Sequence, residues 1–350
     1  MKIALVLVGY GNVARRFVQL LDESREYLTT LNIDPVIAAI VTRRHGRLYE
    51  SAGLEPKRMA KTLIGSGAAD GQPLPFLTSA LDRLRSEAVE ARVVVETTTL
   101  DVRSGEPAIS HVRAALARGA HVITANKGPV AFAYRALAAE AATAGVSFLF
   151  EGAVMDGVPI FGLVREAMPA LDLRGFRGVV NSTTNYLITA MERGEAFDAA
   201  LARMQDAGVA EADPSLDVDG WDAAAKAAAL ANVLLDADLT PLAVAREGIS
   251  AQTAARAQAA AREGKRLKLL ASATGRGDSV RAEVALVELD ASDPLAILDG
   301  QANALELDTW PLGRVVITQR DGGLEKTAYA LLADLVSIGR RNARSPEPHG

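Results

Sequence analysis

The first 150 residues alternate short apolar runs with segments of helical pattern. The apolar runs are rich in β-branched residues and nearly free of charge, as expected for strands covered on both faces. The helical segments have Pro107 in a first turn, and Gly119 and Gly145 just after helix ends, which matches the chemistry of helix termini. We predict strands at Ile3–Val8, Pro35–Val41, Arg92–Glu96, His121–Thr124 and Val146–Phe150, and helices at Asn12–Leu28, Glu106–Arg118 and Pro129–Ala144. This alternation predicts a parallel sheet with crossover helices.

After Phe150 the pattern changes. A glycine-rich turn at Gly152–Pro159 precedes a helix, and long alanine-rich tracts with high helix propensity follow. We predict helices at about Ala196–Ala207, Trp221–Asp236 and Ala251–Glu263, strands at Arg281–Leu289, Ala304–Leu307 and Arg314–Thr318, and a last helix at Glu325–Arg341 that packs back onto the first part of the chain. The glycine- and proline-rich stretch Ile64–Pro75 is predicted to be a surface loop, and the tail Asn342–Gly350 to be disordered.

Composition narrows the functional classes. A chain of 350 residues is long enough for two domains. It has no cysteine, which excludes disulfides, thiolate zinc sites and thioester chemistry and fits a reducing compartment. A formal net charge of −5 argues against a nucleic-acid partner. The apolar N-terminal run is too short to span a bilayer, and no later run has the ~18 uncharged apolar residues that a span needs, so no membrane partner is expected.

The turn after the first predicted strand suits a dinucleotide. It reads Gly9-Tyr10-Gly11-Asn12-Val13-Ala14 and opens a helix. Gly9 permits a tight turn, Gly11 lets backbone N–H groups approach a pyrophosphate at the helix N-terminus, and Ala14 is small enough for helix–sheet packing. The alternative is a tight strand–helix turn that binds nothing. The strand, turn and helix context favours the cofactor, with Gly9, Gly11, Asn12 and Val13 in contact with it.

The end of the second predicted strand bears on the choice of coenzyme. It reads Val41-Thr42-Arg43-Arg44, without the acid that usually holds the ribose 2′-hydroxyl of NAD. Arg43, Arg44 and, farther on, Lys57 offer cations for a 2′-phosphate, which favours NADP over NAD. The alternative is a solvated basic loop.

The densest charge pattern lies between residues 210 and 226. Five carboxylates gather at or just before a helix start, and Asp222 precedes Lys226 by four residues on the same helix face; the five are Glu211, Asp213, Asp217, Asp219 and Asp222. One interpretation is an acidic helix N-terminus with an ion pair. The other is a receptor for a substrate ammonium, with a lysine that exchanges a proton with a hydroxyl or carbonyl oxygen.

No histidine competes with that lysine as a proton partner. His45 and His111 are predicted to lie on the surface, His121 opens a strand, and His349 lies in the tail.

Taken together, these motifs resemble homoserine dehydrogenase over nearly the whole chain. The resemblance rests on the cofactor turn, Glu106-Pro107, Thr124-Ala125-Asn126-Lys127, the segment Asn181–Tyr186, and the Ala210–Pro214 stretch followed by Asp217, Gly220, Asp222 and Lys226. It implies reversible, NAD(P)-dependent interconversion of L-homoserine and L-aspartate 4-semialdehyde on the route to threonine, methionine and isoleucine.

The same resemblance implies a role for each matching residue. Lys226 would donate the proton in reduction and accept it in oxidation, and Lys127 would lie between nicotinamide and substrate and orient the reacting oxygen. Glu211, Asp217 and Asp222 would hold the amino acid, with Gly208 near its head and among the cofactor contacts. Thr97, Thr98, Lys127 and Gly323 would contact the cofactor. The resemblance also implies a monovalent cation, usually sodium, at Glu151, Val154, Asp156 and Val158, mostly through backbone carbonyls. The alternative is a plain glycine turn that binds no ion.

The implied fold is α/β: a doubly wound Rossmann nucleotide-binding domain over residues 1–150, completed by a C-terminal helix at about 322–342, and a mixed α+β domain over 151–321 that binds substrate and forms a homodimer. The resemblance also implies a cytoplasmic enzyme. The chain ends too soon for the C-terminal regulatory ACT domain of many relatives, so a short form is expected.

Two segments depart from the family pattern. Met155 and Asp156 stand where small residues are usual, and the loop from Gln319 to Lys326 aligns poorly apart from Gly323, with Thr327 just beyond it. These departures, together with the arginines that suit NADP, support an alternative function, an NADP-binding sensor or degenerate paralogue without catalysis. A dehydrogenase of other small hydroxy acids is a minor alternative, and aspartate semialdehyde dehydrogenase is excluded because it needs a nucleophilic cysteine.

Overall fold

The structure is a computed structural model that describes residues 1–44, 46–55, 73–206 and 213–344. Its first sheet has the strand order β3-β2-β1-β4-β5-β6. All neighbouring strands are parallel except the β2–β3 pair, which is antiparallel. The strands are β1 Lys2–Val8, β2 Asp34–Val41, β3 Arg47–Tyr49, β4 Ala91–Glu96, β5 His121–Thr124 and β6 Phe148–Leu149.

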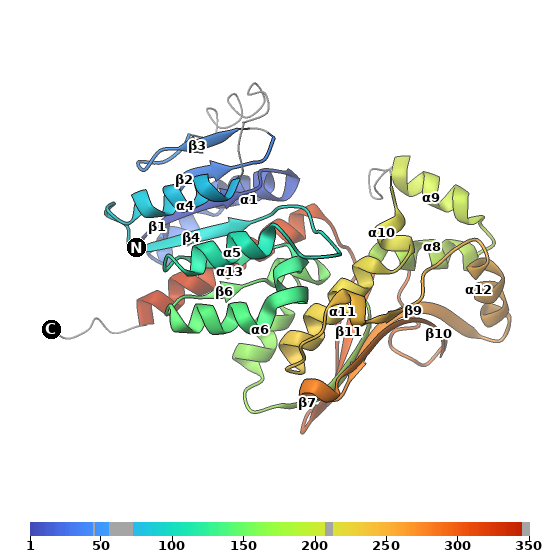
Figure 1. Cartoon of the computed structure of the whole chain (residues 1–350). Helices are drawn as coiled ribbons and strands as arrows, with labels where there is room; N and C mark the ends of the chain where they lie inside the picture. Colours follow the sequence, from blue (N-terminus) through green and yellow to red (C-terminus); the bar gives the residue numbers. More distant parts are fainter. Residues whose placement is uncertain (45, 56–72, 207–212, 345–350) are drawn as a thin grey trace.

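Helices cover both faces of this sheet (Figure 1). Strand β1 shows why, because its alternate side chains enter two different cores. Ala4, Val6 and Val8 belong to the cluster that contains residues of α4, α5 and α6, whereas Ile3, Leu5 and Leu7 belong to the cluster formed with α1 and α13. The helices are α1 Asn12–Glu23, α2 Arg25–Thr30, α4 Pro73–Leu84, α5 Ala108–Leu116, α6 Lys127–Thr143 and α13 Leu324–Arg344.

The second sheet is mixed, with the order β12-β11-β7-β9-β10-β8. Its pairs are antiparallel apart from the short parallel β8–β10 pair. The strands are β7 Asp172–Val179, β8 Ala245–Arg246, β9 Lys265–Thr274, β10 Arg281–Asp290, β11 Asn303–Trp310 and β12 Gly313–Gln319, and the helices around them are α8 Ser182–Glu192, α9 Phe197–Asp206, α10 Ser215–Val218, α11 Trp221–Leu234 and α12 Thr253–Arg262. Helix α11 packs against α6 on one side and against β9 and β10 on the other, so it joins the two layers.

Short helical turns link the longer elements, and the first four of them lie between the two sheets. They are η1 Glu151–Ala153, η2 Met155–Gly157, α7 Ile160–Gly162, η3 Leu163–Ala167, η4 Pro241–Ala243 and η5 Gly277–Ser279. Both η1 and η2 contact α13. Within the described ranges, no helix is both long and apolar enough to cross a membrane.

The α/β fold class is confirmed, with four corrections to individual elements. The helix predicted over Asn12–Leu28 is two helices that meet at Ser24. Helix α4 begins at Pro73, inside the predicted loop, because proline is tolerated in a first helical turn. Residues 342–344 continue α13 and are not part of a disordered tail. Strands β3, β7, β8 and β9 were not predicted, since each carries at least one charged residue among its apolar ones.

Candidate functional site

The turn after β1 leaves open space in front of α1. Gly9 has a φ of +88°, and a Cβ there would lie 2.9 Å from the carbonyl carbon, carbonyl oxygen and Oγ1 of Thr97. The turn therefore needs glycine. Gly11 caps α1 without a side-chain hydrogen bond, and a Cβ at Gly11 would meet nothing within 4 Å. Because the first N–H groups of a helix have no partner inside it, this arrangement leaves donors facing room for an anionic group.

A hydrogen-bond network fixes the carboxyl ends of β4 and β5 beside that turn. The buried carboxylate of Glu96 accepts hydrogen bonds from the Thr98 N–H at 3.0 Å and from the Thr124 hydroxyl at 3.0 Å. The Asn126 amide donates to the Thr98 carbonyl at 3.0 Å and accepts from the Gly128 N–H at 2.8 Å, which caps α6. Thr97, Thr98 and Lys127 are thereby held at one edge of the sheet.

Two lysines meet one aspartate at the same edge. The Asp222 carboxylate lies 3.4 Å from Lys127 Nζ and 2.9 Å from Lys226 Nζ, and Lys226 also donates to the Val180 carbonyl at 2.6 Å. Burial raises the pKa of Asp222, but the ammonium groups of Lys226 and Lys127 outweigh burial and hold the pKa well below its usual range. Burial lowers the pKa of Lys226, but Asp222 and, more distantly, Asp156 raise it above its ordinary value. The site therefore holds a protonated lysine at neutral pH.

Asn181 organises the carboxylates from a separate element. It caps α8 by accepting the Thr184 N–H at 2.8 Å, and its amide donates to Asp217 at 2.7 Å and to Asp222 at 2.8 Å. Burial, followed by the nearby charge of Asp222, raises the pKa of Asp217. No role was predicted for Asn181, although it opens the motif Asn181–Tyr186.

A cavity of about 230 Å³ is lined by both lysines. It lies between the first turn of α1, the ends of β4 and β5, the turn of η1 and η2, and the helices α11 and α13. Its lining residues are Val13, Thr97, Thr98, Ala125, Lys127, Gly152, Ala153, Met155, Asp156, Lys226 and Thr327. The charged part of the cavity thus adjoins the open turn after β1, which is the arrangement that a redox reaction between a dinucleotide and a small polar substrate needs.

Three of the four predicted cation ligands already accept hydrogen bonds from other residues of the chain. The Glu151 carboxylate accepts the N–H groups of Phe161 and Gly162, and burial raises its pKa to about 6. The Asp156 carbonyl accepts the Gln319 amide at 3.4 Å, and the Val158 carbonyl accepts the Ile160 N–H at 2.8 Å. Val154 is buried. Among the described residues, no group of three or more His, Cys, Asp or Glu is arranged to hold a metal ion.

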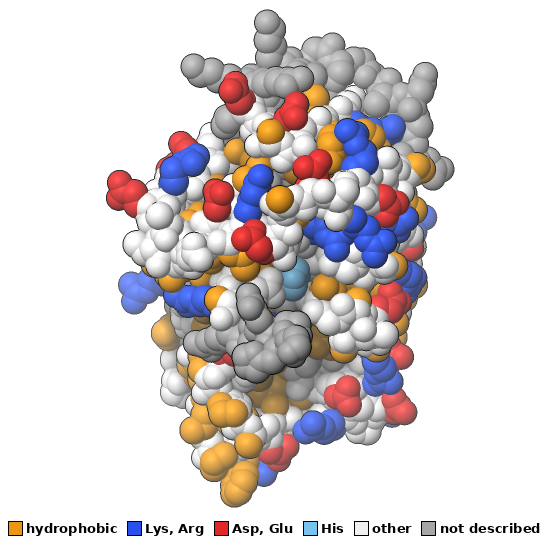
Figure 2. Space-filling view, turned by 90° about the vertical axis from the view of Figure 1, so that its left-hand side faces the viewer, with side chains coloured by type: hydrophobic (Ala, Val, Ile, Leu, Met, Phe, Trp, Pro, Cys, Tyr) orange, Lys and Arg blue, Asp and Glu red, His pale blue; other side chains and the backbone are white. Residues whose placement is uncertain are grey.

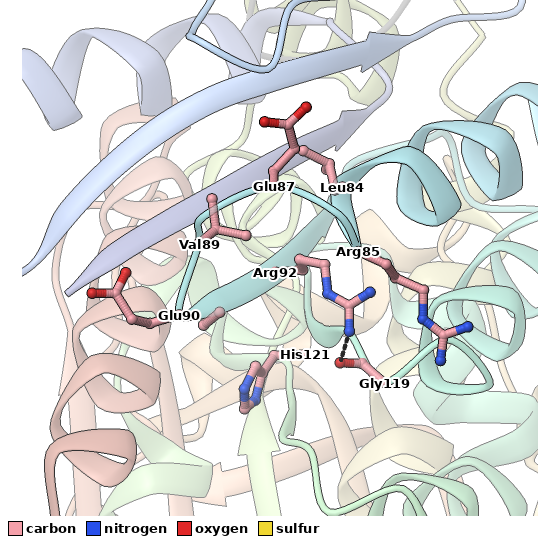
Figure 3. Close-up of a pocket in the computed structure, with 9 residues that line it drawn as sticks. Leu84, Arg85, Glu87, Val89, Glu90, Arg92, Gly119 and His121 are labelled. Carbon is pink, nitrogen blue, oxygen red and sulfur yellow. Dashed lines mark hydrogen bonds between the residues drawn. The ribbon is translucent and has the colours of Figure 1, made fainter.

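Two described histidines lie away from the lysines. His111 was predicted to be exposed but is buried, with Nδ1 3.8 Å from Glu96, because it falls on the inner face of α5. His121 faces a separate hollow at the amino ends of β4 and β5, next to Arg92 and Gly119 (Figure 3). Burial, and then the charges of Arg92 and Arg341, lower the pKa of His121 to about 4. This histidine is neutral at neutral pH and lies at the far edge of the sheet from Lys226.

The remaining predicted residues lie outside the cavity lining or outside the described residues. Arg43 and Arg44 follow β2 and are exposed, and neither forms an ion pair with another described residue. Lys57, Gly208 and Glu211 lie outside the described residues, as does His45. Gly323 lies just before α13 and donates its N–H to the Asp156 carboxylate at 3.0 Å. Asn126 was missed as a positioning residue because its partner Thr98 is distant in sequence.

Comparison with known proteins agrees with this geometry. Residues 9–151 match the family model of the homoserine dehydrogenase NAD-binding domain, and residues 159–336 match the homoserine dehydrogenase model. An NAD(+)-dependent homoserine dehydrogenase of Pseudomonas canavaninivorans is 36% identical over 98% of both chains. A homoserine dehydrogenase of Mycobacterium tuberculosis is 33% identical over 97% of this chain and 72% of its own length.

Solved structures show the same relationship. The crystal structure of a putative homoserine dehydrogenase from Archaeoglobus fulgidus has a TM-score of 0.82 and 27% identity, and covers 96% of this chain and 99% of its own. That of a homoserine dehydrogenase from Thiobacillus denitrificans also has a TM-score of 0.82, with 28% identity over 100% of this chain and 76% of its own. The chain therefore belongs to the homoserine dehydrogenase family of NAD(P)-dependent oxidoreductases.

Proposed function

We propose that the cavity beside Lys226 interconverts L-homoserine and L-aspartate 4-semialdehyde. The observation that carries this proposal is the meeting of Lys127 and Lys226 on Asp222, at a cavity that also reaches Val13 in the first turn of α1. A dehydrogenase of this kind needs a proton partner and a charged receptor for the amino acid within reach of one nicotinamide position. The cofactor, when bound, would supply or accept the hydride.

Each charged side chain then has a distinct task. Lys226 donates a proton to the aldehyde oxygen in reduction and removes the hydroxyl proton in oxidation. Its raised pKa keeps it charged at neutral pH, which suits the donor role. Lys127 comes from a different helix and orients the reacting oxygen. Asp217 and Asp222 receive the substrate ammonium, together with the predicted contact at Glu211.

The described residues fit a dinucleotide at the first sheet. The uncapped start of α1 suits the pyrophosphate, and Gly9, Gly11, Asn12 and Val13 would lie along it. Thr97, Thr98, Lys127 and Gly323 are proposed to contact the nicotinamide half, with Gly208 as a further predicted contact. We propose residues 1–150 with the last helix as the cofactor unit and residues 151–321 as the substrate unit.

We further propose a homodimer in the cytoplasm, and the cation site needs separate consideration. A sodium ion at Glu151, Val154, Asp156 and Val158 would compete with the N–H donors described above for the oxygen atoms of these residues. We therefore assign it no step of the reaction. The β11–β12 hairpin supports a homodimer, because its large apolar residues Trp310 and Leu312 are 61% and 59% exposed to solvent. Figure 2 shows hydrophobic side chains gathered at the lower end of the molecule. The cytoplasm is the expected compartment.

The absorbance band of the reduced nicotinamide, which the oxidised form lacks, allows the function to be tested directly. The purified protein is mixed with L-homoserine and either NAD or NADP, and in reverse with L-aspartate 4-semialdehyde and the reduced coenzymes. We expect turnover that saturates with L-homoserine. Tight coenzyme binding without turnover of either substrate would contradict the proposal and favour the sensor function. Turnover with NAD that added NADP suppresses would identify an enzyme inhibited by its own alternative coenzyme.

Arg43 and Arg44 are expected to govern the choice of coenzyme. Both are exposed at the end of β2, where a 2′-phosphate of NADP would lie. Replacing both with alanine should weaken NADP binding by roughly tenfold or more, since each charge-assisted hydrogen bond contributes about 1.5 to 3 kcal/mol, and leave NAD binding nearly unchanged. Fluorescence titration of the reduced coenzymes measures both. Equal losses for the two coenzymes would mean that the arginines do not read the 2′-phosphate.

A further inference from the structure

The turn Met155–Gly157 has an unusual backbone. Its three residues have φ values of +52°, +43° and +88°, so two residues with side chains adopt the left-handed region in succession. Such conformations cost free energy and persist only where surrounding contacts hold them. Gly157 is required here, because a Cβ at this position would overlap the Lys326 carbonyl oxygen in the first turn of α13. The turn and the start of α13 therefore touch backbone to backbone.

The Asp156 carboxylate ties the same two segments together. One oxygen accepts the Gly323 N–H at 3.0 Å, and the other accepts the Thr327 hydroxyl at 3.4 Å. The Asp156 carbonyl accepts the amide of Gln319, at the end of β12, at 3.4 Å. Three contacts thus run from this one residue to the segment that leads from the second sheet into α13. An anionic acceptor makes stronger hydrogen bonds than a neutral one, and it also suits the start of a helix.

Without the Asp156 carboxylate, Gly323 and Thr327 would lose their acceptor on the turn. The turn and the start of α13 therefore meet at this side chain.

Their meeting point lies at the cavity of the site. Asp156 and Thr327 line it together with Thr97 and Thr98 on the proposed cofactor side and Lys226 on the substrate side. We propose that Asp156 is a positioning residue that latches the start of α13 against this cavity and thereby holds the dinucleotide in place. This inference rests on the proposed function for the identity of the ligand. Since its carboxylate already accepts two donors, Asp156 takes no proton from the substrate, and its effect on coenzyme binding runs through α13.

The test is the variant Asp156→Gly. Glycine removes the carboxylate, keeps the backbone carbonyl and relieves the left-handed strain, so the turn itself is preserved. Asp236→Gly is the matched control, because Asp236 is also a left-handed aspartate, with a φ of +56°, but is exposed and absent from the cavity lining. We expect the dissociation constant of the reduced coenzyme to rise roughly tenfold in Asp156→Gly and to stay unchanged in Asp236→Gly. Fluorescence titration without substrate measures it.

Two further readouts separate positioning from chemistry and from folding. In steady-state turnover, Asp156→Gly should raise the KM for coenzyme far more than it lowers kcat. The variant Asp156→Asn still accepts hydrogen bonds and tolerates the left-handed region, so it should keep part of the coenzyme affinity that Asp156→Gly loses. Hydrogen exchange of the free protein should speed up at residues 322–328 in Asp156→Gly alone. Coenzyme affinity equal to that of Asp236→Gly, or a loss confined to kcat, would overturn the proposal. If the wild type binds coenzyme but does not turn over L-homoserine, the affinity comparison still decides the latch, and only the proposed function fails.

Discussion

The variant Lys226→Ala is expected to lose turnover of L-homoserine by roughly 10³-fold, since positioned general acids and bases contribute about 10² to 10⁴. The reason is geometric as well as chemical. Lys226 is nearly buried at the cavity, its ammonium is held by Asp222 and the Val180 carbonyl, and neither described histidine lies beside it. Coenzyme binding should survive, because the first turn of α1 and the ends of β4 and β5 do not depend on this side chain. Steady-state rates and fluorescence titration of coenzyme measure the two effects separately.

Lys265→Ala serves as the control for removal of a lysine. Its ammonium lies 3.4 Å from Glu263 at the start of β9, outside the cavity, and its turnover should match the wild type. A rate in Lys226→Ala within a factor of a few of the wild type would remove Lys226 from the reaction. Lys127 would then be the next lysine to test, because it shares the same aspartate.

The variant Asp222→Asn is expected to lower kcat by about 10²-fold, the order of loss that follows when reacting groups are misplaced by an ångström. Asparagine keeps the shape but removes the charge that both lysines share. Asp222 is the strongest of the carboxylates that raise the pKa of Lys226, so the pKa of Lys226 should fall in the variant. In oxidation the deprotonated lysine is the base, so the rise of the rate with pH should move to lower pH than in the wild type.

Asp219→Asn is the matched control, because Asp219 belongs to the same acidic segment but is exposed and absent from the cavity lining. It should leave both kcat and the pH profile unchanged. A pH profile in Asp222→Asn that does not move, or moves to higher pH, would show that Asp222 does not set the protonation of Lys226. A cofactor affinity close to the wild type would confirm that the fold is intact.

Local patterns predict the first sheet and the centre of the site well. The apolar run of β1 and the glycine turn after it identify the start of the cofactor site, since both depend only on neighbouring residues. The four-residue spacing of Asp222 and Lys226 likewise places both groups on one helix face. Each of these inferences needs one element alone.

The parts that were missed depend on partners distant in sequence. Strand β9 has charged residues within it, and its Lys268 is fully buried because it donates to the Asn185 side chain and the Leu298 carbonyl, neither of which the strand's own pattern reveals. His111 was predicted to be exposed because its neighbour Glu96 belongs to strand β4, which helix α5 covers only in the folded chain. Asn181 gains its role only when the start of α8 meets α10 and α11, and Asp156 only when η2 meets the start of α13. Tertiary packing determines the burial and the partners of these residues, and the sequence of a single segment does not reveal either.

The return of α13 to the first sheet has a consequence for the order of folding during synthesis. The side chains Ile3, Leu5 and Phe17 share a core with Leu331 and Leu335 of α13. A nascent chain that has produced the first sheet therefore leaves this apolar surface uncovered while the whole second sheet is being translated. The amino-terminal half emerges first from the ribosome but completes its core last, and in that interval it is the half most in need of protection from aggregation.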